Sequence, residues 1–243
     1  MHNSFSHPLR RALLAALAVL ALCAGPAQAK LVNASLRVEA AGKALAGGKT
    51  YATGTAKFKT DTRAACGGSG KTVTVPGATA LGILATAAPT NPLLRPVGVS
   101  DKYSFGLVVC GIGRYVGFAQ QSFWLYKVDH KSPEVGADQY KLKSGDQVLW
   151  FFEDTKTGSN TGDELALSAP AHAVAGKPFT VHVWDYDSHG KRKPAAGAKV
   201  GGKTTNASGA ATIKVSKPRR LRLRATHGKD IPSAPTVVRV TRS

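Results

Sequence analysis

The sequence has few of the residues from which metal sites are built. It contains three cysteines and seven histidines in 243 residues, with no Cys-x-x-Cys and no His-x-x-x-His spacing, so the ligand pattern of a tetrahedral zinc site is missing. Asp185 and Asp187 are close together, but residues 191–193 after them are all basic, which disfavours calcium. We expect no metal site and no metal cofactor.

Motifs of catalytic centres are also missing. There is no Gly-x-Ser-x-Gly and no His-Glu-x-x-His, and the serine-lysine spacing at 188–191 falls in a glycine-containing turn. Residues 65–72 and 197–204 match the spacing of phosphate-binding loops. Neither is followed by a helix pattern, whose N-terminus such a loop needs. We therefore predict a protein without catalytic residues, not an enzyme.

Long apolar runs are restricted to residues 12–24. Two arginines precede this run and Ala27-Gln28-Ala29 follows it, a pattern typical of a secretory signal peptide over residues 1–29 with cleavage before Lys30. Cys23 offers the alternative of a lipid-modified cysteine, although the preceding Leu22 is not small. No later run is long enough for a membrane helix. We expect a secreted or extracellular protein, with attachment to the cell surface as a further option.

Two cysteines, Cys66 and Cys110, remain after residue 29. Export leads to an oxidising compartment, and two cysteines allow one pairing only. We expect a disulfide that closes a loop of roughly forty residues and stabilises the fold by about 3–4 kcal/mol.

Acidic residues are scarce towards the C-terminus. Residues 30–168 carry 16 basic and 11 acidic residues, a net charge of +5, whereas residues 169–243 carry 15 and 3, a net charge of +12. A polar, glycine-containing segment at 153–164 separates the two parts. We predict two domains, 30–165 and 166–243, the second of which contacts anionic partners such as polymers of the cell envelope.

The hydrophobic pattern gives each half a different fold class. Residues 80–88 have one apolar face and end at Pro89, which predicts a helix among strands at 31–39, 71–75, 104–109, 123–128 and 147–152. One helix within such a strand order predicts an α+β β-grasp domain. Short alternating strands at 179–184, 211–215, 221–225 and 237–240 predict an all-β sandwich, immunoglobulin-like or transthyretin-like.

Residues 122–152 carry a more specific pattern. A Trp124-x-Tyr126 strand runs into Val128-Asp129-His130, and Tyr140-Lys141-Leu142, Gly145-Asp146 and the aromatic strand ending at residues 150–152 follow. With the helix before it, this resembles the C-terminal domain of transcobalamin and intrinsic factor, a β-grasp ligand-binding module shared by many bacterial secreted proteins. The resemblance covers about residues 31–152.

The resemblance implies a ligand surface. In that family the module covers one face of a corrinoid, but a large helical domain completes the site and is missing here, so corrinoid binding does not carry over with it. The family's Val-Asn-Gly turn is replaced by Val128-Asp129-His130, and histidine is less suited than glycine to a left-handed conformation. We expect no other cofactor.

The outward aromatic residues of this segment are the candidate ligand site. Trp124, Tyr126 and Tyr140, beside Asp129 and His130, would form a flat apolar platform with polar edges for a small molecule or glycan. The alternative is that these aromatic rings pack in the core against Leu81 and Leu84.

Arginines and leucines alternate at 219–224. Leu221 and Leu223 would face the core, and Arg220, Arg222 and Arg224 would line one outer face about 6.6 Å apart, extended by Arg219. Each guanidinium can form a bidentate contact with a phosphate or carboxylate. The alternative is that these charges protect a sheet edge from aggregation.

Together these patterns predict a secreted or envelope-associated, non-enzymatic binding protein. The first domain would bind a small molecule or glycan, and the second an anionic envelope polymer; we expect no specific nucleic acid partner. The alternative is an envelope adhesion or structural protein in which both domains are spacers.

Overall fold

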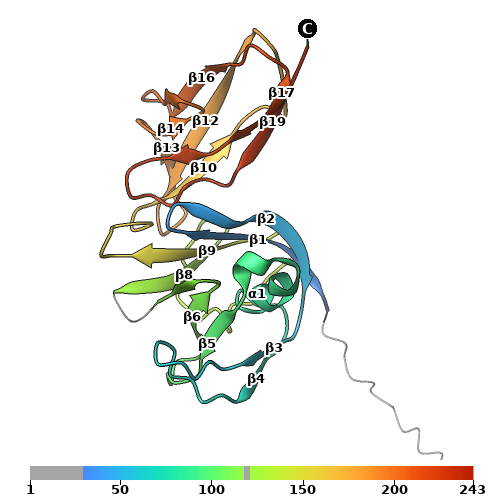
Figure 1. Cartoon of the computed structure of the whole chain (residues 1–243), viewed down its shortest axis with the longest axis vertical. Coiled ribbons are helices and arrows are strands. Elements are labelled where there is room, and N and C mark those ends of the chain that lie inside the picture. The colour runs from blue at the N-terminus through green and yellow to red at the C-terminus, as the bar shows by residue number, and fades with distance from the viewer. Residues whose placement is uncertain (1–29, 118–120, 243) are drawn as a thin grey trace, which may run out of the picture.

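The computed structural model describes residues 30–117 and 121–242, which form two lobes stacked along the long axis of the molecule (Figure 1). We call residues 30–163 the N-terminal lobe and residues 164–242 the C-terminal lobe; each has its own cluster of buried apolar side chains. The predicted signal peptide and Cys23 lie outside the described residues. No helix of the described part combines the length and apolar character needed to cross a membrane.

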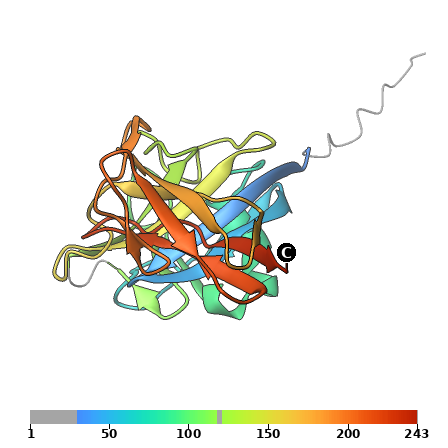
Figure 2. The same ribbon diagram turned by 90° about the horizontal axis from the view of Figure 1, so that it is seen from above.

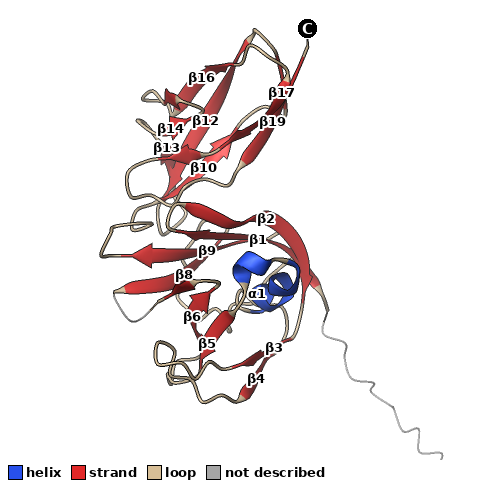
Figure 3. Cartoon of the chain, viewed as in Figure 1, coloured by secondary structure: helices blue, strands red, loops and turns tan. Residues whose placement is uncertain are grey.

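A four-stranded sheet forms the centre of the N-terminal lobe. Its strand order is β2 (Lys43–Thr53), β1 (Val32–Ala40), β9 (Gln147–Asp154) and β8 (Ser122–Val128). β1 runs parallel to β9, and the other neighbouring pairs are antiparallel. The helix α1 (Gly82–Ala87), blue in Figure 3, packs on one face of this sheet and buries its apolar side chains there.

Both faces of β1 are covered. Leu36 and Val38 point into the N-terminal core, whereas Arg37 and Glu39, which alternate with them, point towards the C-terminal lobe; all four are buried. Successive side chains of a strand point to opposite faces, so one apolar and one charged row leave the same strand.

The remaining strands of this lobe form two small, separate sheets. These are β3 (Ala56–Lys59) with β4 (Thr72–Val75), and β5 (Val97–Ser100) with β6 (Val108–Ile112) and β7 (Tyr115–Val116). The structure contains the expected disulfide between Cys66 and Cys110, with a Cα–Cα distance of 5.4 Å. It joins the loop that follows β3 to strand β6.

The prediction of an α+β β-grasp domain was wrong. Only six of the described residues form α-helix, because the predicted helix over 80–88 passes into the 3-10 helices η1 (Ala88–Thr90) and η2 (Pro92–Leu94), where Pro89 and Pro92 cannot donate helical hydrogen bonds. The loops at 60–71 and 101–107 lack strands, so β3 to β7 do not extend the main sheet. The lobe is predominantly β-structure in several sheets.

The C-terminal lobe is built from strands alone within the described residues, consistent with the predicted sandwich. One sheet contains β10 (Glu164–Ser168), β12 (Pro178–Tyr186), β13 (Arg192–Pro194) and β16 (Ala210–Lys214), and a second has the order β11 (His172–Val174), β19 (Thr236–Thr241), β17 (Arg219–Leu223). A third, smaller sheet joins β15 (Lys203–Thr204), β14 (Lys199–Val200) and β18 (Ala225–Thr226). The immunoglobulin-like or transthyretin-like topology stays a prediction.

The core of the C-terminal lobe lies between its two larger sheets. Val181 and Val183 of β12 and Val238 and Val240 of β19 are buried in one cluster, so the alternate residues of each strand point outwards. The predicted domain boundary at 165/166 falls within β10, and the domain division itself stays a prediction. Seen along the long axis in Figure 2, the orange and red strands of this lobe lie in front of the N-terminal strands.

Candidate functional site

Trp124 of the predicted aromatic platform lies in the core. Its side chain is buried, its ring centroid is 5.2 Å from that of Phe152, and its indole Nε1 donates a hydrogen bond of 2.9 Å to the carbonyl oxygen of Tyr115. Trp150 on the neighbouring strand is buried in the same way and donates to the carbonyl oxygen of Ala80. The core alternative therefore holds for Trp124, which presents no ring face to a ligand.

Tyr126 and Tyr140 are half-buried at the rim of this core. The Tyr126 ring stacks on Trp150 at 5.4 Å and meets Tyr140 edge-on at 6.3 Å, and its hydroxyl donates to the carbonyl oxygen of Val135. Burial, followed by the neighbouring Tyr140 and Asp138, raises the pKa of the Tyr126 phenol well above its usual value. Of the predicted ligand residues, Tyr140 and Asp129 line one hollow of about 470 Å³.

Asp129 and His130 form a two-residue hairpin turn with φ angles of 49° and 70°. Val128 and Lys131 exchange both backbone hydrogen bonds across it, and the Asp129 carboxylate accepts the amide of Gln147 at 2.9 Å. Two left-handed residues match the twist of a hairpin, so His130 takes this conformation although histidine is less suited to it than glycine.

The turn carries His130 away from the aromatic residues and into the contact between the lobes. Its imidazole stacks on Tyr186 with ring centroids 3.9 Å apart, and Nδ1 lies 3.1 Å from a carboxylate oxygen of Glu164. His130 is therefore an interlobe residue, and the five predicted ligand residues do not form one site.

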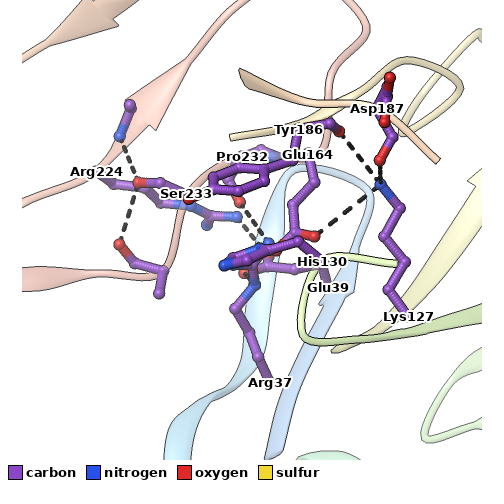
Figure 4. A network of polar contacts seen from close by, with 12 residues as sticks. Arg37, Glu39, Lys127, His130, Glu164, Tyr186, Asp187, Arg224, Pro232 and Ser233 are labelled. Atoms are coloured by element: carbon purple, nitrogen blue, oxygen red, sulfur yellow. Dashed lines mark hydrogen bonds and ion pairs between the residues drawn. The ribbon is translucent and has the colours of Figure 1, made fainter. Parts of the chain in front are cut away.

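Buried charges join the two lobes (Figure 4). Arg37 lies 3.2 Å from the Glu164 carboxylate and donates to the carbonyl oxygen of Pro232, while Glu39 pairs with Arg224. Apolar contact adds to these pairs, since Ile231 packs on Leu149 and Phe151 of the sheet face that carries Arg37. We call Arg37, Glu39, Lys127, His130, Glu164 and Arg224 the interlobe charge cluster.

The two carboxylates of this cluster respond differently to burial. Burial raises the pKa of Glu39 from 4.5 to about 7, against the opposing effect of Arg37 and Arg224. Burial acts on Glu164 in the same direction, but His130, Arg37 and Lys127 outweigh it and hold the pKa of Glu164 below its usual value. Glu164 is therefore ionised at neutral pH and holds three cationic or polar side chains around it.

The outer face of the β11-β19-β17 sheet is the candidate functional site. Across its three strands, His172 pairs in register with Arg239, and Arg239 pairs with Arg220. All three side chains are exposed, whereas Leu223 and Val238 of the same sheet point into the core. We call His172, Arg239, Arg220 and Arg222 the basic face.

The acidic residues of the C-terminal lobe all contact groups outside the basic face. Glu164 pairs with Arg37, and Asp185 lies 3.3 Å from Lys193. Asp187 accepts backbone amides of its own turn, and Asp230 lies 2.8 Å from His227. Throughout residues 30–117 and 121–242, no carboxylate lies within ion-pair distance of Arg220, Arg222 or Arg239. The basic face therefore has no internal counterion within the described chain.

The predicted arginine ladder is only partly available to a ligand. Arg220 and Arg222 are exposed and share one face, as expected, but Arg219 lies in register with the core residue Val240 and so belongs to the other face. Arg224 donates to the carbonyl oxygen of Gly42 and pairs with Glu39, which places it in the interlobe charge cluster.

Arg222 connects the basic face to the N-terminal lobe. It lines a hollow of about 360 Å³ together with Lys49, Tyr51 and Asn91. The ammonium group of Lys49 lies over the Tyr51 ring, 5.4 Å from its centroid. A second cation therefore borders the basic face at the point where the lobes meet.

Sequence reasoning missed Arg239 and His172. Arg239 stands between Val238 and Val240, and this alternation would have placed it on the outer face. The pairing of β19 between β11 and β17, which sets Arg239 opposite Arg220, had no sequence signal.

Comparison with known proteins gives one family match. A family model described as a domain of unknown function (DUF4430) matches residues 110–154, which include the 122–152 pattern and strands β8 and β9. The matched segment lies in the sheet-rich N-terminal lobe. No curated protein matches the chain.

Among solved structures, a crystal structure of haptocorrin in complex with Cbi is similar to part of the chain. The TM-score is 0.32 and the sequence identity 15%, over 52% of this chain and 26% of that one. The chain thus spans about a quarter of the haptocorrin chain.

Proposed function

We propose that this protein is a secreted, non-enzymatic binding protein whose basic face holds an anionic polymer of the cell envelope. The observation that carries the proposal is the row His172–Arg239–Arg220, which crosses three strands without a carboxylate. Like charges directly opposite each other destabilise a sheet, so such a row favours the bound state with an anion. The disulfide supports an oxidising compartment.

Edge protection accounts for only part of this pattern. β17 is an edge strand, and charges there discourage pairing with another chain. Arg239, however, lies on β19, the central strand of its sheet, which has no free edge to protect. A ligand therefore explains the basic face better than the spacer alternative does.

The spacing of the cations favours an extended anion. Neighbouring strands lie about 4.8 Å apart and alternate residues of one strand about 6.6 Å apart, so Arg239, Arg220 and Arg222 form a flat array on this scale. A chain of phosphates or carboxylates can contact several of them at once, and each guanidinium can offer two donors.

The test compares the affinity for inorganic polyphosphate of the original chain with that of a double variant that carries Arg220→Gln and Arg239→Gln. Each cation near an anionic surface contributes about 1 kcal/mol, so the double variant should bind about thirtyfold more weakly. Isothermal titration calorimetry at fixed salt measures the change.

The matched control replaces the exposed Lys57 and Lys59 of β3 by glutamine, which removes the same charge from the other lobe. It should change the affinity by less than about threefold, because distant charges are screened. An equal loss in both double variants would show attraction by net charge alone and would contradict the assignment to the basic face.

A small-molecule site in the N-terminal lobe is the second candidate. The observation that favours it is the hollow beside Tyr140 and Asp129, where an aromatic edge and a carboxylate lie together. With Trp124 in the core, this hollow offers one half-buried ring in place of the expected platform.

A further inference from the structure

A further hollow lies in the N-terminal lobe, between the start of β2, the 3-10 helix η2 and the turn that joins β6 to β7. Its volume is about 380 Å³. The lining includes Lys43, Leu45, Leu93, Arg95, Arg114 and Tyr115, and we call it the Leu93 hollow. It shares no residue with the basic face or with the hollow beside Tyr140.

Two contacts fix the walls of the Leu93 hollow. The Asn91 side chain donates to the carbonyl oxygen of Leu45 at 2.9 Å and accepts the amide of Leu93 at 3.1 Å, which holds η2 against β2. Gly113 has a φ of 59°, and a Cβ atom at this position would lie 2.3 Å from the carbonyl oxygen of Leu93. Only glycine lets the turn approach η2 so closely. The hollow is therefore preformed, and a ligand does not have to order its walls.

Much of the lining is apolar. Leu45 is buried, whereas Leu93 lines the same hollow with 57% of its surface exposed. The half-buried Tyr115 adds an aromatic ring. A ligand with an apolar part would remove the exposed surface of Leu93 from water, which favours binding.

Three cations line the same hollow. Lys43, Arg95 and Arg114 are all exposed. The guanidinium carbon of Arg114 lies 5.1 Å from the centroid of the Tyr115 ring, and its Nη2 donates to the Tyr115 hydroxyl at 3.0 Å, which leaves other donors of Arg114 available. Among the described residues, no carboxylate lines the hollow or lies within ion-pair distance of these cations. The lining is therefore complementary to a ligand that carries an anionic group.

The hollow of about 360 Å³ beside Arg222 adjoins the Leu93 hollow. Ala44, Leu45 and Leu93 line both, so an apolar surface continues from one into the other. A ligand whose acidic head lies in the Leu93 hollow can extend a hydrocarbon chain across Leu93.

We propose that the Leu93 hollow binds a free, single-chain anionic amphiphile, a carboxylate or phosphate carried on an alkyl chain. The head contacts Arg95 and Arg114, each of which offers bidentate donors, and the chain lies across Leu45 and Leu93. An apolar hollow with a few polar groups at one part of its lining is typical of a small-molecule site. A concave hollow fits one molecule better than it fits the flat surface of a bilayer.

The test titrates octanoate, acetate and octanol, each on its own, into the isotope-labelled protein and follows the amide signals by two-dimensional NMR. Octanoate has both the acidic head and the chain, whereas acetate has only the head and octanol only the chain. Octanoate should bind at least about tenfold more tightly than either of the others. It should shift the amide signals of Leu93, Gly113 and Arg114.

Two variants separate the contribution of the chain from that of the head. Leu93→Ser should weaken octanoate binding about fivefold, because it removes apolar contact at an exposed position with little risk to folding. The double variant Arg95→Gln, Arg114→Gln should weaken octanoate binding about tenfold and leave octanol binding unchanged. A structural role of these arginines would weaken the binding of both ligands.

Matched controls lie elsewhere in the same lobe. Leu125→Ser replaces another exposed leucine, and the Lys57→Gln, Lys59→Gln double variant removes two other exposed cations. Both should bind octanoate as the original chain does, and an equal loss in the lysine variant would show attraction by net charge alone and contradict the proposal. Polyphosphate affinity should be unchanged by Leu93→Ser, so this proposal and that for the basic face can fail separately.

Three further results would overturn the proposal. The first is unchanged octanoate affinity in both Leu93→Ser and the Arg95→Gln, Arg114→Gln variant. The second is a set of shifted amide signals that lies only at other surfaces, such as the hollow beside Tyr140. The third is binding to phosphatidylglycerol vesicles without binding of free octanoate, which would make this region a membrane contact and not a site for a free amphiphile.

Discussion

Replacing Glu164 by alanine should lower the free energy of unfolding by about 3–5 kcal/mol. Glu164 is 2% exposed and faces Arg37 at 3.2 Å, His130 at 3.1 Å and Lys127 at 4.0 Å. Removing its carboxylate leaves cationic side chains buried without their main counterion, and an uncompensated buried charge is far more costly than a lost surface pair. Urea denaturation of the two chains measures the difference.

The matched control is Glu134→Ala, which removes a carboxylate from an exposed loop. It should change the free energy of unfolding by no more than about 0.5 kcal/mol, as surface substitutions usually do. A loss below about 1 kcal/mol for Glu164→Ala would mean that solvent reaches Arg37 and Lys127 and that the charge cluster does not hold the lobes together.

Raising the pH from 4.5 to 7 should lower the contribution of Glu39 to the free energy of unfolding by roughly 2–3 kcal/mol. The pKa of Glu39 is raised from 4.5 to about 7 in the folded chain, with burial as the main cause. The folded state therefore holds this proton more tightly than the unfolded state. Its contribution is fully present below the unfolded pKa and is lost as pH rises through the folded pKa.

The measurement compares the free energy of unfolding of the original chain with that of Glu39→Gln at several pH values. Groups outside the interlobe charge cluster titrate equally in both chains, so the difference between the two curves reports Glu39 together with its coupling to Glu164. The original chain should lose stability relative to the variant as pH rises between 4.5 and 7. Parallel curves over this window would show that Arg37 and Arg224 keep Glu39 ionised throughout.

Some strand positions were predictable because alternation is a local signal, but β2 was not predicted and the expected strand at 104–109 overlaps β6 at two residues only. Val181 and Val183 on β12 alternate with polar and aromatic residues and are buried as expected, and β8 and β9 fall within two residues of the predicted ranges. The disulfide followed from the count of cysteines and the export signal, not from the fold.

The arrangement of the strands was not predictable in the same way. The pattern at 80–88 is equally apolar whether it makes a helix of nine residues or the six residues of α1, and nothing in it shows that β3 to β7 leave the main sheet. Pairing depends on contacts between distant residues. The β-grasp interpretation failed at this step.

The contacts of the charged residues were also not predictable from the sequence. Arg37 and Glu39 alternate with Leu36 and Val38, which is the pattern of a strand with one solvated face, yet the C-terminal lobe covers that face. Arg224 looks identical to Arg220 in the sequence but pairs with Glu39 across the lobes. Whether a charged side chain is exposed depends on the tertiary structure, and the local sequence pattern does not show it.

The most direct test of the central claim is the salt dependence of polyphosphate binding. If the basic face contacts the polymer, log K should fall linearly with log salt concentration, with each contact contributing about −0.7 to −0.9 to the slope. Replacing Arg220 and Arg239 by glutamine should make the slope less negative by about 1.4–1.8. An unchanged slope in this double variant would contradict the account, because the polymer would then be held by other cations.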